Sequence, residues 1–204
     1  MVEYSVVIQA GGASKRMGYD KALAPFINGT MLEYLIDQVK GLGREMFIIS
    51  NNPVDYQRFN LPVFSDVIKG IGALGGIYTA LYHTNTDYCL LLACDMPYVN
   101  LDVIKLLLGA AEGHDVVVPR IGDGLFEPFR AVYGKACLPQ ILKAIENGER
   151  KAISFFENVN VHYIEEAEIT KYDPNLDSFF NVNTPEDLEK ARELALRDWN
   201  QAKE

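Results

Sequence analysis

The chain lacks several features that mark large classes of proteins. Its 204 residues include 19 lysines and arginines against 28 aspartates and glutamates, a net charge of −9, so it is a poor candidate for binding a nucleic-acid backbone. Its longest apolar run, around Tyr88–Ala93, is far shorter than the roughly 20 residues that cross a bilayer. The N-terminus also lacks the basic, apolar and cleavage segments of a secretory signal. We therefore expect no nucleic-acid or membrane partner, and a cytoplasmic location.

Cysteine and histidine are scarce as well. The three cysteines are odd in number and lack the spacing of metal ligands, which argues against a disulfide framework and favours buried thiols in a reducing compartment. The three histidines, His83, His114 and His162, stand outside the loops described below. We expect them to be structural or exposed.

The composition that remains is that of an ordinary globular domain, with 49% hydrophobic and 23% charged residues. Strand-like and helix-like segments alternate to about residue 120, which predicts an α/β fold: a doubly wound, mostly parallel sheet with helices on both faces. One domain over residues 1–204 is the simplest reading. The expected strands are residues 5–10, 46–49, 61–64, 88–93, 115–119, 129–133 and 159–164. The expected helices are residues 31–40, 101–111, 138–147 and 185–199, with one more running from the glycine-dense segment 70–76 to about residue 82.

A glycine-rich loop follows the first expected strand. Residues 10–23 read AGGASKRMGYDKAL, and glycines there let backbone N–H groups approach an anion closely. Arg16 and Lys21 can neutralise phosphate oxygens, arginine through its fork and lysine as a point charge. The loop is neither a P-loop nor a dinucleotide fingerprint, because both G-x-x-x-x-G-K-[ST] and G-x-G-x-x-G are missing. A glycine-rich turn with solvated basic residues is the alternative.

A carboxylate follows the most apolar expected strand. Ligands of open α/β sheets bind outside the carboxyl ends of the strands, and Asp95 stands at such an end. Mg²⁺ takes one or two protein carboxylates together with substrate phosphates and water, so Asp95 is our candidate metal ligand. The alternative role, a cap for the helix at 101–111, suits Asn100 better.

Two further loops contain candidate ligand-binding residues. Asp66 and the glycine-dense segment 70–76 offer a surface on which a base or ribose could lie, although a flexible connector would have the same composition. Near the C-terminus, Thr184 followed by proline is typical of a helix start. Asn181 and Asn183 just before it are less easily explained by folding, so they are candidates to face a metal or an acceptor.

Together these segments resemble the molybdenum cofactor guanylyltransferase family. The resemblance covers nearly the whole chain and rests on four matches in the family's order and spacing. These are residues 10–23, residues 72–76 (GALGG), residues 94–97 (CDMP) and residues 181–186 (NVNTPE).

The resemblance implies that GMP is transferred from GTP to molybdopterin, or to its molybdenum-loaded form, with release of pyrophosphate. It implies Mg²⁺ as cofactor and transient contact with cofactor-handling proteins. Arg16, Lys21 and Asp95 would be catalytic, Arg16 and Lys21 on the triphosphate and Asp95 on Mg²⁺. Asn181 and Asn183 would face the pterin phosphate. The nucleotide would be held by Ala10, Gly11, Gly12, Lys21, Asn52, Asp66, Gly72, Gly76 and Asp95.

The chain departs from the family at two places. Gln9 stands where leucine is frequent, a side chain that could touch the base. Residues 127–131 (EPFRA) match the family loosely, at a segment where a polar residue precedes the proline and contacts to the pterin are expected. The alternatives are a cytidylyltransferase or another small-molecule nucleotidyltransferase of the same fold, a metal-dependent glycosyltransferase, and a nucleotide-binding cofactor chaperone. The resemblance implies guanine and not cytosine, because cytidylyl relatives tend to read Ala-Ala-Gly in the first loop and lack an aspartate before the lysine. Pro97 replaces the second aspartate of the Asp-x-Asp that glycosyltransferases favour.

Overall fold

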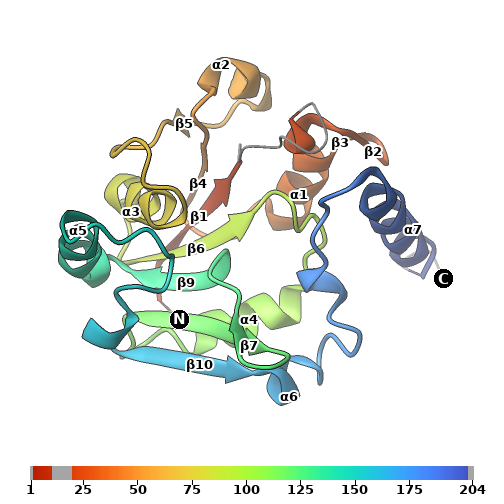
Figure 1. Ribbon diagram of the computed structural model, residues 1–204. Helices are drawn as coiled ribbons and strands as arrows, with labels where there is room; N and C mark the ends of the chain where they lie inside the picture. The colour runs from red at the N-terminus through yellow and green to blue at the C-terminus, as the bar shows by residue number, and fades with distance from the viewer. Residues whose placement is uncertain (1, 11–19, 202–204) are drawn as a thin grey trace.

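The computed structural model describes residues 2–10 and 20–201. An eight-stranded sheet has the order β10-β7-β9-β6-β1-β4-β5, with β8 paired to β7 (Figure 1). Its strands are β1 (Tyr4–Gln9), β4 (Glu45–Ile49), β5 (Val63–Phe64), β6 (Tyr88–Ala93), β7 (Val116–Ile121), β8 (Leu125–Phe126), β9 (Arg130–Gly134) and β10 (Val161–Glu165). A separate hairpin consists of β2 (Pro25–Phe26) and β3 (Gly29–Thr30).

Most neighbouring strands of the large sheet are parallel. β1 pairs in parallel with β4 and β6, and β10 pairs in parallel with β7. β9 is antiparallel to both β6 and β7, and β8 is antiparallel to β7. Residues 122–129, which join β7 to β9, are too few for the crossover of about a dozen residues that a parallel return requires. The predicted α/β, mostly parallel sheet is confirmed.

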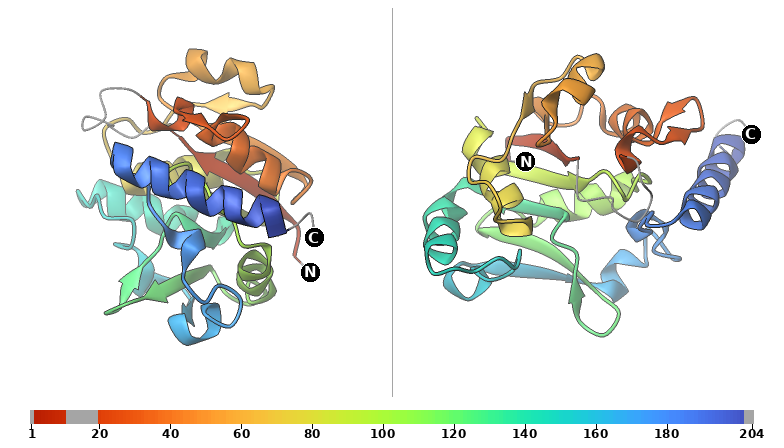
Figure 2. Two further views of the ribbon diagram at one scale, coloured as in Figure 1. Left: turned by 90° about the vertical axis from the view of Figure 1, so that its right-hand side faces the viewer. Right: turned by 45° about the horizontal axis from the view of Figure 1, so that its top comes forward.

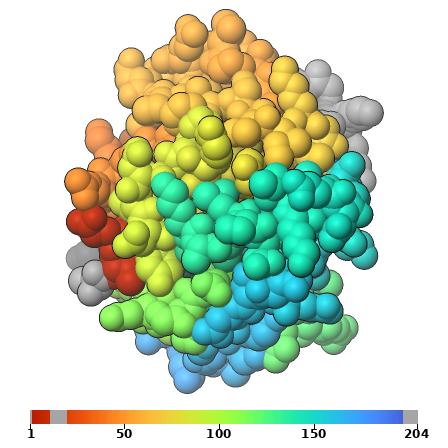
Figure 3. All heavy atoms as spheres, turned by 90° about the vertical axis from the view of Figure 1, so that its left-hand side faces the viewer, coloured from red at the N-terminus to blue at the C-terminus, as the bar shows by residue number. Residues whose placement is uncertain are grey.

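Helices cover both faces of this sheet, as predicted (Figures 1 and 2). They are α1 (Met31–Val39) and α4 (Leu101–Gly109) on one face, and α3 (Ala73–His83) and α5 (Leu138–Glu146) on the other. Because side chains alternate along a strand, Val6 and Ile8 join the core under α1 and α4, whereas Val7 joins the core under α3 and α5. Figure 3 shows the outside of the layer formed by α3 and α5.

The C-terminal part of the chain returns to its N-terminal part. α7 (Pro185–Gln201) lies beside the β2–β3 hairpin and the start of α1 (Figure 2). Leu188 and Ala191 of α7 form a small core there with Phe26 and Met31. This packing brings Val182 and Asn183 next to Lys21.

The remaining elements are short. They are α2 (Pro53–Tyr56), α6 (Glu166–Ile169) and 3-10 turns at Lys21–Leu23, Gln57–Phe59, Lys135–Cys137, Phe156–Asn158 and Asp177–Phe179. Across residues 2–10 and 20–201, no helix has both the length and the apolar character needed to cross a membrane.

Candidate active site

The carboxyl ends of β1, β4 and β6 border a cavity of about 570 Å³, a volume within the usual range for small-molecule sites. Parallel pairing places the strand ends side by side, since Gln9 pairs with Ile49 on one side and Ala93 on the other. Four of the predicted site residues line the cavity: Asp66, Gly72, Gly76 and Asp95. Asn51, which the sequence does not single out, also lines it, as does Phe129 of the loosely matching segment 127–131.

Lys21 and Asn183, from distant segments of the chain, meet beside Asp95. The Nζ atom of Lys21 donates to the Oδ1 atom of Asn183 and to the backbone oxygen of Val182, both at 2.9 Å. The same Nζ atom lies 3.8 Å from the Oδ2 atom of Asp95. The backbone N–H of Val182 donates to the backbone oxygen of Asp95 at 2.8 Å. Three residues predicted separately, a cation, a carboxylate and an amide, therefore form one cluster.

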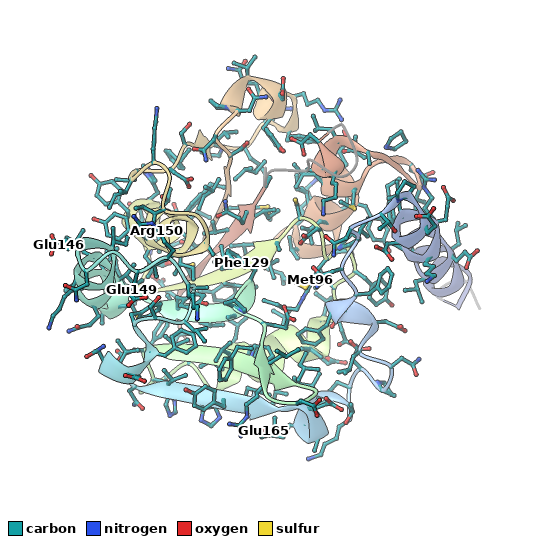
Figure 4. The ribbon with its side chains drawn as sticks, in the orientation of Figure 1. Met96, Phe129, Glu146, Glu149, Arg150 and Glu165 are labelled. Atoms are coloured by element: carbon teal, nitrogen blue, oxygen red, sulfur yellow. The ribbon has the colours of Figure 1, made fainter. Side chains whose placement is uncertain are left out.

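Burial disfavours the charged forms of Asp95 and of the ionisable groups around it. It raises the pKa of the Asp95 carboxyl, an effect that Lys21 and Arg130 reduce. It also raises the pKa of Glu127 and lowers the pKa of the fully buried Arg130 to about 10. Arg130 donates to the backbone oxygen of Met96 at 2.7 Å, which ties β9 to the loop that contains Asp95. Met96 and Phe129 lie near the carboxyl end of β6 (Figure 4).

Asn51 and Asp66 form a paired group elsewhere on the cavity wall. The Nδ2 atom of Asn51 donates to the Oδ2 atom of Asp66 at 2.7 Å, and the Asp66 backbone N–H donates to the Oδ1 atom of Asn51 at 3.0 Å. The other carboxylate oxygen of Asp66 is enclosed and has no hydrogen-bond partner. An unsatisfied buried acceptor is costly, so a ligand that donates a hydrogen bond there would be favoured.

Gln9 and Gly76 touch each other on the cavity wall. A Cβ atom on Gly76 would lie 2.6 Å from the Oε1 atom of Gln9, an enclosed oxygen that also lacks a hydrogen-bond partner. Gly76 therefore leaves room for the Gln9 amide. The prediction that the whole segment 70–76 is a loop is wrong in its second half, because α3 begins at Ala73. Gly70 and Gly72 remain outside the helix, with φ values of 76° and 74° that favour glycine.

Several predicted site residues lie elsewhere. Asn52 is exposed, does not line the cavity, and its amide donates to Asp55, so Asn51 occupies the place predicted for it. Ala10 is buried, and its backbone N–H donates to Ile49 at 2.9 Å. Asn181 is half-buried and is not among the residues that line this cavity. Three predicted residues lie outside the described part of the chain: Gly11, Gly12 and Arg16.

Sequence reasoning assigned no individual role to two residues of this region, Asn51 and Arg130, although Arg130 belongs to the loosely matching segment 127–131. Asn51 differs from Asn52 only by its position after β4, and Arg130 stands in a strand where its charge is hidden. Arg130 pairs with Leu92 in the strand register, and this pairing places Arg130 beside the loop that contains Asp95. A single sequence does not predict which strand becomes an antiparallel neighbour. The expected structural role of His83 agrees with its ring stacking on Phe64, with centroids 3.8 Å apart.

Comparison with known proteins identifies relatives of the chain over most of its length. Residues 6–162 match the model of the MobA-like NTP transferase domain. The molybdenum cofactor guanylyltransferase of Desulfosudis oleivorans is 36% identical over 94% of this chain and 95% of its own length. That of Syntrophotalea carbinolica is 35% identical over 92% and 90%. The crystal structure of molybdopterin-guanine dinucleotide biosynthesis protein A from Archaeoglobus fulgidus has a TM-score of 0.81 at 28% identity, covering 95% of this chain and 99% of that one.

The family match spans most of the chain and includes most of β1, the Lys21 turn, the Asn51–Asp66 pair and Asp95. The two curated relatives extend the similarity over almost the full length. The chain therefore belongs to the MobA-like NTP transferase family.

Proposed function

We propose that this nucleotidyltransferase transfers GMP from GTP to molybdopterin, releasing pyrophosphate and forming a guanine dinucleotide cofactor. The observation that carries the proposal is the meeting of Lys21, Asp95 and Asn183 beside a cavity of nucleotide size. The names of its relatives supply the base and the acceptor. The resemblance noted in the sequence points to the same pair of substrates.

The cavity wall offers hydrogen-bond acceptors to a bound base. The enclosed oxygens of Asp66 and Gln9 are acceptors without partners. Guanine offers an N–H and an adjacent amino group on one edge, whereas cytosine offers a single amino group. This contrast supports GTP as the donor nucleotide.

The transfer needs positioning and charge neutralisation more than covalent chemistry from the protein. A terminal phosphate oxygen of the acceptor attacks the α-phosphorus of GTP, and a new phosphorus–oxygen bond forms. The bond between the α-phosphorus and the bridging oxygen to the β-phosphate breaks, and pyrophosphate leaves with that oxygen. Lys21 neutralises charge on the triphosphate, with Arg16 as its expected partner. No general base is assigned, because a phosphate monoester is already largely ionised at neutral pH.

The donor set around Asp95 fits a hard divalent cation. Asp95 supplies a half-buried carboxylate and Asn183 an amide oxygen nearby, and oxygen ligands of this kind suit Mg²⁺. In the described residues no group of three His, Cys, Asp or Glu side chains could hold a metal, so phosphate oxygens would complete the shell. Bound there, Mg²⁺ would neutralise charge that develops on the phosphates.

The test is pyrophosphate release with Mg²⁺ and molybdopterin, comparing GTP with CTP, ATP and UTP. Release with GTP alone is the expected result. Release with CTP would keep the chemistry and overturn the base, and GTP binding without release would favour a nucleotide-binding cofactor chaperone. Asp95→Asn should abolish release, whereas Asp102→Asn, at an exposed carboxylate paired with Lys105 on α4, should not. Transient contact with cofactor-handling proteins and a cytoplasmic location stay predictions.

A further inference from the structure

We propose that Tyr56 is a positioning residue for Lys21, acting through a hydrogen bond to Asp20. The inference rests on the proposed function, because it concerns how the triphosphate-binding lysine is held. It assigns a role to a tyrosine that lies outside every motif of the sequence.

Tyr56 ends α2, the short helix that follows Asn51, and its side chain is completely buried. Its hydroxyl donates to the Oδ2 atom of Asp20 at 2.5 Å. Burial raises the pKa of Tyr56 far above its ordinary value, so the phenol keeps its proton and remains a donor. A short bond from a neutral donor to a carboxylate is among the stronger hydrogen bonds in proteins.

Asp20 uses its two carboxylate oxygens for different purposes. The Oδ1 atom accepts from the backbone N–H of Ala22 at 3.0 Å and so caps the 3-10 turn Lys21–Leu23. The Oδ2 atom is left for Tyr56. The carboxylate is therefore fixed at both oxygens, and the turn that begins at Lys21 is fixed with it.

The consequence falls on the Lys21 side chain. Its Nζ atom reaches Asn183 and lies 3.8 Å from Asp95, although four flexible carbons separate it from the backbone. When the backbone at the base of such a side chain is already fixed, the side chain loses less conformational entropy on binding a phosphate. Because Tyr56 follows β4 and Lys21 follows β1, the Tyr56–Asp20 bond joins the loops at the ends of two neighbouring strands.

A double-mutant cycle separates positioning from mere stability. Tyr56→Phe removes one oxygen atom, and its kinetics with GTP are compared in the wild-type and Lys21→Ala backgrounds. In the wild-type background we expect kcat/KM to fall about tenfold, the size of a lost hydrogen bond to a charged group. In the Lys21→Ala background we expect less than about a twofold further loss, since residues that act through one another are not additive.

Tyr88→Phe is the matched control. Tyr88 begins β6 at the opposite end of the sheet, so deleting its hydroxyl should leave kcat/KM unchanged in both backgrounds. Thermal unfolding of all variants shows whether any loss of activity merely follows stability.

Equal losses from Tyr56→Phe in both backgrounds, or no loss in either, would overturn the inference. If the wild-type protein releases no pyrophosphate, the proposed function fails, and the same cycle is read from GTP affinity by calorimetry. A drop in GTP affinity that disappears with Lys21→Ala would then still support the role of Tyr56, and an additive drop would reject it.

Discussion

Lys21 is the residue on which the proposed chemistry depends most directly. Lys21→Ala should lower turnover by about two to three orders of magnitude, because one preorganised charge near the reacting phosphate is worth roughly 3–4 kcal/mol. The fold should persist, since the lysine contacts Val182 and Asn183 only through its tip. Turnover and thermal unfolding should be measured beside Lys105→Ala, an exposed lysine paired with Asp102. Near-normal turnover of Lys21→Ala would remove it from the site.

Gly76 offers a second test at a single residue. In Gly76→Ala the new methyl group would stand 2.6 Å from Gln9 Oε1, so the flexible Gln9 amide must move into the cavity. Helix propensity favours alanine by about 1 kcal/mol, so stability should not fall. We expect KM for GTP to rise several-fold, measured beside Gly109→Ala, where a Cβ meets nothing within 4 Å. An unchanged KM would mean that the Gln9 amide is not part of the nucleotide site.

These residues show what a sequence can predict at this scale. Lys21 and Asp95 stand in recognisable loops, so their residue types and positions identified them before their contact was known. Asn51 and Tyr56 belong to no pattern, and Gln9 stands out only as a departure from the family. The contacts of all three depend on distances between segments that are far apart in the chain. Such distances follow from the packing of strands and loops, which a single sequence does not encode locally.

At the scale of elements, the start of α1 has the sharpest local cause. Thr30 and Glu33 form a capping box: Thr30 Oγ1 accepts from the Glu33 N–H at 3.3 Å, and Glu33 accepts from the Thr30 N–H at 2.7 Å. Thr30→Ala should lower the free energy of unfolding by about 1 kcal/mol in a denaturant titration at pH 7, and Thr30→Ser should retain most of it.

The pH dependence of that cap gives a further check. The Thr30 hydroxyl and backbone N–H donate hydrogen bonds to the Glu33 carboxylate and lower its pKa, so the folded state favours the ionised form. This contribution is present above the unfolded pKa of 4.5 and is lost as pH falls through the lower folded value. The cost of Thr30→Ala should therefore shrink in acid, and a constant cost from pH 7 to pH 3 would contradict the capping box.

Elements were predictable where the pattern was strong. The strand at Tyr88–Ala93 has the predicted bounds, and the predicted helix at 31–40 differs from α1 by one residue. The two-residue strand β5 lies within the strand predicted at residues 61–64. The strands β2, β3 and β8 and the 3-10 turns were not predicted, because they are too short to show a hydrophobic period. The direction of β9 depends on a short connection, and the early start of α3 depends on glycines that pack inside a helix.

At the scale of the whole molecule, a net charge of −9 surrounds a site proposed for anionic substrates. The fold offsets this negative charge locally with two cations close to Asp95. Lys21 comes from the segment after β1, and the buried Arg130 comes from β9. The return of α7 to the N-terminal part supplies Asn183 to the same place. The sequence predicted these segments individually through the family resemblance, and their convergence required the fold. The single-domain reading stays a prediction.

Asp95 should lower the stability of the folded chain at neutral pH. Burial, the largest cause, raises the pKa of the Asp95 carboxyl in the folded state, so the unfolded chain ionises more readily and the charged form destabilises the fold at neutral pH. Asp95→Asn should therefore raise Tm at pH 7 while abolishing turnover, by about 2–4 °C for each kcal/mol gained. The gain should vanish below the ordinary aspartate pKa of 3.8, where both states are protonated.

Mg²⁺ should reverse the order of the two Tm values, so that the wild-type protein becomes more stable than Asp95→Asn. The reason is that a ligand that binds only the folded state stabilises it. Adding Mg²⁺ with a non-hydrolysable GTP analogue should raise the Tm of the wild-type protein well above that of Asp95→Asn. Asp102→Asn, at an exposed carboxylate in an ion pair on α4, should respond like the wild type. If the Tm of Asp95→Asn rose as much as the wild-type Tm on adding Mg²⁺ and the analogue, Asp95 would not be a metal ligand. Another group would then have to hold the ion.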